Sequence, residues 1–127
     1  MFEVSIGFGK SDRDNPNIEN EERILSEWCE LLEKRYGSKF EIKHNSSDYS
    51  TLCPIGCLDI IRLKYGDKAK WIKIFMTNES SVLYRDDERF EKQKKKTESM
   101  WRSDLTDTDI RKYFDVLDYA YDRLTKQ

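Results

Sequence analysis

The fold of this chain is decided by residues 57–77, which read CLDIIRLKYGDKAKWIKIFMT. Two apolar runs flank the pair Gly66-Asp67, and this pattern predicts an antiparallel β-hairpin with a two-residue turn at that pair. Such a turn places Arg62 opposite Trp71. Successive side chains of a strand point to opposite faces, so the hairpin is predicted to have one apolar face and one basic face.

The basic face of this hairpin is the candidate binding site. Four of its residues form what we call the hairpin cluster: Arg62, Lys64, Trp71 and Lys73. Cations that contact phosphates beside an aromatic ring that stacks on a base are typical of nucleic-acid-binding surfaces. Two structural interpretations remain open. The face is an ordinary solvent-facing sheet surface, or its tryptophan is buried under another element with the cations at the edge.

Asp59 is the one charged residue that the alternation places on the apolar face. A buried carboxylate needs a partner or a raised pKa, and such groups are often functional. Nucleases of the PD-(D/E)xK type carry an acid on one core strand and Asp/Glu-x-Lys on the next. Asp59 is similar to the first position, but the aligned triplet is Trp71-Ile72-Lys73, which lacks the second acid. Capping by loop donors is the structural alternative.

The rest of the chain predicts an α+β fold in which a mainly antiparallel sheet of four to five strands packs against two main helices. Apolar residues at helical spacing predict these helices over residues 18–36 and 107–125. Gly37 is expected to close the first helix in a left-handed cap, and Thr106 to head a capping box with Asp109. The other expected elements are strands at 2–8, 40–43 and 82–84, a loop over 45–56, an exposed helix over 85–96, and an edge strand or a loop anchor at 100–101.

Composition places the protein among small, folded, single-domain chains. It has 127 residues, which we expect to form one domain over residues 1–127, with 38% charged residues and a formal net charge of −2. Neither a signal peptide nor an apolar run of about 20 residues is seen, so we expect a soluble cytoplasmic protein that does not contact membranes. The residue usage is typical of an AT-rich bacterial, phage or plasmid genome.

The three cysteines and the single histidine are candidate metal ligands. Cys29, Cys53, Cys57 and His44 could supply a Cys₃His zinc set. However, the C-x₃-C spacing is unusual for a zinc site. Three buried thiols in the reduced state explain the same residues. We therefore expect no metal and no cofactor.

We expect a non-catalytic binding module, because the sequence contains no complete catalytic constellation. It would contact a protein partner or nucleic acid, with near-even odds, through the outer face of the 57–77 hairpin. A phage- or plasmid-encoded accessory or inhibitor protein fits this size. The alternative is a small metal-dependent nuclease-like enzyme, or an inactive relative of one, centred on Asp59.

Overall fold

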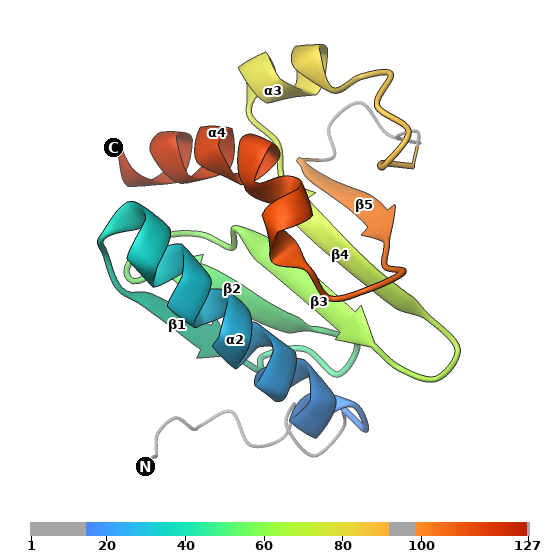
Figure 1. Ribbon diagram of the computed structural model, residues 1–127. Helices are drawn as coiled ribbons and strands as arrows, with labels where there is room; N and C mark the ends of the chain where they lie inside the picture. The colour runs from blue at the N-terminus through green and yellow to red at the C-terminus, as the bar shows by residue number, and fades with distance from the viewer. Residues whose placement is uncertain (1–14, 92–98, 127) are drawn as a thin grey trace.

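The computed structural model describes residues 15–91 and 99–126 and has the α+β architecture that the sequence predicts (Figure 1). Five strands form one antiparallel sheet in chain order: β1 (Phe40–Lys43), β2 (Ser50–Pro54), β3 (Ile61–Tyr65), β4 (Lys70–Phe75) and β5 (Met100–Asp104). The helices are α2 (Ile18–Tyr36), α3 (Asn78–Leu83), the 3₁₀ turn η2 (Ile110–Tyr113) and α4 (Phe114–Thr125).

The two long helices lie on the same face of the sheet (Figure 1). Helix α2 packs against β1, β2 and β3, and α4 packs against β4. Between the layers lie fully buried side chains from both helices and from the facing side of the strands: Ile24, Leu25, Trp28, Leu32, Leu52, Ile61, Leu63, Ile72, Ile74, Val116, Leu117 and Ala120. The sheet thus has an inner face under the helices and an outer face on the opposite side.

Helix α2 follows the prediction at both ends. It covers residues 18–36, and Gly37 ends it with φ of 69° while its N–H donates to the carbonyl of Glu33 at 2.8 Å. A left-handed residue is least strained as glycine, so the sequence signal was sufficient here. Trp28 Nε1–H donates to the carbonyl of Thr108 at 2.9 Å, which ties the middle of α2 to the segment before η2.

Strand β2 lies inside the predicted 45–56 loop. All five of its residues are buried, and helix α2 packs against it. Such a strand shows no alternation of polar and apolar residues, and its Ser50 and Thr51 resembled turn residues. The prediction of a loop at this position was therefore wrong.

Two predicted elements in the second half of the chain have a different secondary structure from the one expected. Residues 82–84, predicted as a strand, end the short helix α3, which Thr77 caps through a reciprocal hydrogen bond with Ser80. Residues 85–91 form turns rather than a helix, because Asp87 accepts a hydrogen bond from the backbone N–H of Arg89 and competes with helix formation. The predicted edge strand at 100–101 is confirmed as β5.

The predicted last helix begins later than expected. Regular α-helix starts at Phe114 after η2. Asp109 is the N-cap of η2, and its carboxylate accepts from the N–H of Arg111 at 3.1 Å. The predicted capping role of Thr106 was wrong. Two expectations, the strand at 2–8 and the part of the charged segment over 92–96, lie outside the described residues.

The hairpin forms, but its turn lies one residue later than predicted. Gly66 N–H donates to the Ala69 carbonyl at 2.9 Å, and the register pairs Lys64 with Trp71 rather than Arg62 with Trp71. A shift of two residues in pairing is even, so each side chain keeps its predicted face within β3 and β4. Gly66 packs closely against Asn17: a Cβ there would lie 2.8 Å from the terminal amide nitrogen of the Asn17 side chain, which would have to move.

The alternation of side chains between the two faces of the sheet is interrupted just before β3. Asp59, which precedes this point, therefore does not lie on the predicted face. Ile60 N–H donates to the carbonyl of Leu52, although Leu52 is the register partner of Ile61. This is the pattern of a β-bulge, in which two residues face one. Ile60 and Ile61 are both fully buried, so Asp59 leaves the apolar face. The predicted buried carboxylate was therefore wrong.

A buried carboxylate does occur, at Glu21 on α2. Its Oε1 accepts hydrogen bonds from Asn15 Nδ2 at 2.9 Å and from Ser50 Oγ at 2.7 Å, and its Oε2 accepts from the Tyr65 N–H at 2.9 Å. The side chain is fully buried. Three charge-assisted hydrogen bonds offset the cost of removing the charge from water and join α2 to β2 and to the end of β3.

Replacing Glu21 with Ala is expected to lower the free energy of unfolding by about 3 kcal/mol, because three buried donors lose their acceptor. Urea unfolding followed by circular dichroism measures this. Glu22→Ala, at the neighbouring exposed position, is the matched control and should cost less than about 1 kcal/mol. Equal losses for the two variants would contradict the role assigned to Glu21.

The C-terminal end of α2 is joined to α4 by stacked rings and one carboxylate. Tyr36 and Tyr121 stack with centroids 4.0 Å apart. Asp118 accepts two hydrogen bonds from Arg35, at 2.8 and 2.7 Å, and one from the hydroxyl of Tyr36 at 2.6 Å. The hydrogen bonds from Arg35 hold the pKa of Asp118 below its usual range.

A carboxyl group whose pKa is lower in the folded than in the unfolded protein stabilises the fold at pH values above its unfolded pKa. This stabilisation is lost as the pH falls through the folded pKa. We therefore expect Asp118→Asn to be less stable than wild type above about pH 5, where the unfolded aspartate is ionised. The difference should shrink steadily as the pH falls below about 4. Thermal unfolding of both proteins across this range measures the gap, and a gap that stays constant would contradict the assignment.

Candidate functional site

The outer face of the sheet carries a continuous row of basic side chains. The registers pair Lys43 with Thr51, Thr51 with Arg62, Arg62 with Lys73, and Lys73 with Arg102. One residue from each of the five strands therefore lies in the same line across the sheet, and four of the five are cations. We call this line the basic row.

The basic row follows from strand geometry. Directly paired residues of antiparallel strands project to the same face, so a cation at the matching position of each strand extends the line. Neighbouring strands lie about 4.8 Å apart, so the row spans roughly 19 Å. In the described part of the chain no helix or strand lies over this face (Figure 1).

Two aromatic rings lie beside the basic row. Trp71 and Tyr49 have centroids 6.2 Å apart at an interplanar angle of 52°, and we call them the aromatic pair. Lys73 Nζ lies 5.1 Å from the centre of the Trp71 ring, and the Arg102 guanidinium lies 5.6 Å from it. Arg62 lies over Tyr49 at 5.1 Å. Trp71 is only 5% exposed although it lies on the outer face of the sheet.

Carboxylates flank the row and orient some of its cations. Asp59 accepts a hydrogen bond from Arg62 Nε at 3.0 Å, and Lys64 forms an ion pair with Asp48. Arg102 pairs with Asp104 at 3.0 Å and lies 3.7 Å from Glu91. Among the described residues, no carboxylate lies within 4.0 Å of the ammonium groups of Lys43 and Lys73. The face is thus basic along its middle and acidic at its margins.

The hydroxyl of Thr51 stands out within the row. It is the buried side-chain polar atom that has no hydrogen-bond partner in the described structure. Thr51 is 1% exposed and lies between Lys43 and Arg62. A buried hydroxyl without a hydrogen-bond partner is costly.

All four residues of the hairpin cluster lie on this outer face, where the sequence predicted them. Sequence reasoning missed four further residues of the face: Lys43, Tyr49, Thr51 and Arg102. A weak signal was available for Arg102, which follows the predicted edge strand. Alternation with Phe40 and Ile42 places Lys43 on the outward side of its strand, but no sequence signal showed that this strand lies in line with the hairpin.

Asp59 is partly exposed rather than buried, with 27% of its side chain accessible. Its carboxylate is paired with Arg62, and no group of three His, Cys, Asp or Glu side chains is arranged to hold a metal ion within the described ranges. The geometry therefore gives Asp59 an orienting role for a cation of the basic row.

The cysteines and His44 are dispersed among different contacts. Burial raises the pKa of the Cys29 and Cys53 thiols to about 11, so both are protonated at neutral pH. The ring nitrogens of His44 lie 3.0 Å from Ser50 Oγ and 2.9 Å from Glu22 Oε1.

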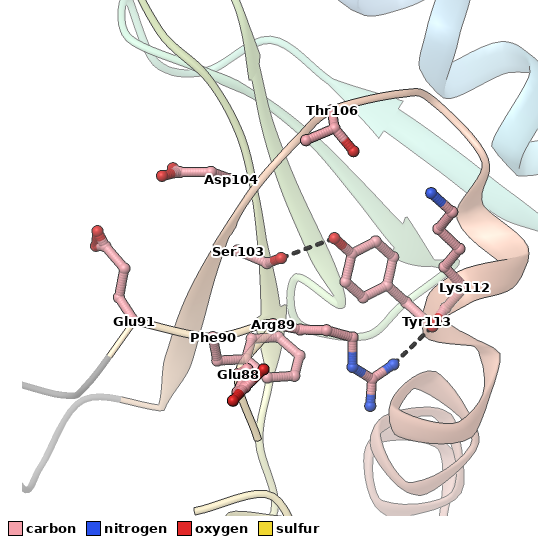
Figure 2. Close-up of a pocket in the computed structure, with 9 residues that line it drawn as sticks. All are labelled: Glu88, Arg89, Phe90, Glu91, Ser103, Asp104, Thr106, Lys112 and Tyr113. Atoms are coloured by element: carbon pink, nitrogen blue, oxygen red, sulfur yellow. Dashed lines mark hydrogen bonds between the residues drawn. The ribbon is translucent and has the colours of Figure 1, made fainter. Parts of the chain in front are cut away.

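A hollow of about 370 Å³ lies between β5 and η2, and Figure 2 shows the side chains around it. Its floor is closed by a hydrogen bond of 2.7 Å between Ser103 Oγ and Tyr113 Oη. Arg89 donates to Asp87, to Asp115 and, at 2.6 Å, to the carbonyl of Lys112. Its hydrogen bonds hold the pKa of Asp87 below the usual range. Arg89 thus joins the turn segment over residues 85–91 to α4, so its hydrogen bonds have a structural role.

Comparison of the chain with protein-family models, with curated proteins and with solved structures found no match. No helix of the described residues is long and apolar enough to cross a membrane. The geometry of the site is therefore the basis for the function proposed below.

Asp59→Asn is expected to change the free energy of unfolding by less than about 1 kcal/mol, because the pair with Arg62 is partly exposed and screened by solvent. Urea unfolding of this variant, of Arg62→Gln and of the double variant measures the pair directly. A loss of several kcal/mol in Asp59→Asn alone would show that the carboxylate supports the fold beyond this contact.

Proposed function

We propose that this protein is a binding module that holds nucleic acid by its phosphates along the basic row. The observation that carries the proposal is the alignment of Lys43, Arg62, Lys73 and Arg102 across the five strands. Phosphate groups recur at short intervals along a nucleic acid strand, and a line of cations complements such a repeated charge.

The ion pairs that the arginines of the basic row make with carboxylates are weak enough for phosphate to replace them. The pairs of Arg62 with Asp59 and of Arg102 with Asp104 involve side chains that are 27% to 66% exposed. Ion pairs of this kind contribute at most about 1 kcal/mol each. Arginine also binds phosphate oxygens through two parallel hydrogen bonds, so an arriving phosphate competes well for these guanidinium groups.

The charge of the whole chain does not oppose this function. Its net charge of −2 averages over all surfaces, whereas binding depends on the local arrangement of charge. The flanking acids limit the number of phosphates that the face accommodates. We therefore expect binding of moderate affinity in which about four phosphates take part.

A protein partner is the second candidate, and the composition of the face favours it. Tryptophan, tyrosine and arginine are the residues most enriched at the centres of protein interfaces, and Tyr49, Trp71, Arg62 and Arg102 gather here. Acidic residues at the margin would then form the polar rim. Retention of a partner by wild type and its loss in an Arg62→Glu, Lys73→Glu variant would support this candidate.

Titration of a labelled single-stranded oligonucleotide at several salt concentrations tests the nucleic-acid proposal. The slope of log K against log salt should be roughly −3, since each of four phosphate contacts contributes about −0.7 for single strands. An Arg62→Gln, Lys73→Gln variant should bind more weakly and show a slope of roughly −1.4, because two contacts are removed.

The matched control removes two cations from the opposite layer. Arg23 and Lys34 lie exposed on α2, and replacing both with Gln changes the net charge equally without touching the outer face. This control should keep the wild-type slope. Absence of binding by folded wild-type protein at low salt, or equal effects of the two double variants, would remove the proposal.

A further inference from the structure

We propose that the aromatic pair is a base-stacking site that Lys73 and Arg102 cover in the free protein, so that the nucleic acid bound is single-stranded. This inference rests on the proposed function and names the class of nucleic acid. It explains why a tryptophan lies on the outer face of the sheet yet is almost fully covered.

Two cations of the basic row lie over the Trp71 ring. Lys73 and Arg102 lie 5.1 and 5.6 Å from the centre of its ring, and both side chains are partly exposed. Lys73 makes no ion pair among the described residues, so its ammonium is held mainly by the ring. A phosphate that attracts Lys73 and Arg102 therefore also uncovers the ring.

Magnitudes favour this exchange. A cation over an aromatic ring at a partly exposed site changes a binding constant by a factor of about 2 to 5. Stacking of one base on an aromatic side chain is worth a factor of roughly 5 to 150. The cation also regains a charged partner in the phosphate. A base on Trp71 thus replaces a weaker contact with a stronger one.

The geometry also selects single strands. The bases of a duplex are stacked on one another, and their faces do not reach a ring that lies within a sheet surface. The bases of a single strand are free to turn toward Trp71 and Tyr49 while their phosphates follow the basic row. Tyr49, which is partly exposed, is already accessible from the solvent.

Three labelled probes test the inference by fluorescence anisotropy: an oligothymidylate, an abasic chain with the same number of phosphates, and a duplex of the same length. Oligothymidylate should bind roughly 5- to 150-fold more tightly than the abasic chain. Trp71→Leu should lower the ratio of oligothymidylate affinity to abasic affinity toward one. Trp71→Phe, which keeps a ring, should retain most of the difference.

Tyr49→Leu provides a second variant at a partly exposed position, in case the Trp71 substitutions disturb folding, and should also narrow the gap between the two single-stranded probes. Equal affinity of wild type for oligothymidylate and the abasic chain would overturn stacking while leaving phosphate binding intact. Duplex binding as tight as that of oligothymidylate would overturn the preference for single strands. Failure of all three probes to bind would remove the proposed function itself.

Discussion

The hydrogen-bonded register between β3 and β4 is the constraint on which the rest of the structure depends. It places Leu63 against Ile72 on the inner face and Arg62 against Lys73 on the outer face. A slip by one residue would put cations into the core under α2 and α4, at a cost that the small core could not offset. The register therefore holds the packing of the helices and the line of cations in place together.

The two layers meet through polar as well as apolar contacts. Glu21 accepts hydrogen bonds from β2 and from the end of β3, so α2 is tied to the strands that carry the middle of the basic row. At the other end of the helix, Asp118 and the stacked tyrosines join it to α4. One face of the sheet is thereby rigidly supported, and the opposite face can present side chains at fixed spacing, as a site on regular elements requires.

On that opposite face, the positions of the charged side chains matter more than their numbers. Acids and bases are nearly balanced along the chain, but the bases lie in the middle of the sheet and the acids at its margins. The acids orient the arginines at little energetic cost, because partly exposed ion pairs are weak. Two cations of the basic row, Lys73 and Arg102, lie over the Trp71 ring on this face.

The sequence by itself determined α2 with its glycine cap, the hairpin and the face to which Arg62, Lys64, Trp71 and Lys73 belong, because these depend on local periodicity of 3.6 or 2 residues. It failed at β2, whose residues are buried on both faces, and at Asp59, where a bulge interrupts the alternation. Only the tertiary structure brought Lys43 and Arg102 into line with the hairpin. Strand order and long-range pairing join residues nearly sixty positions apart, and no local pattern in a single sequence carries that information.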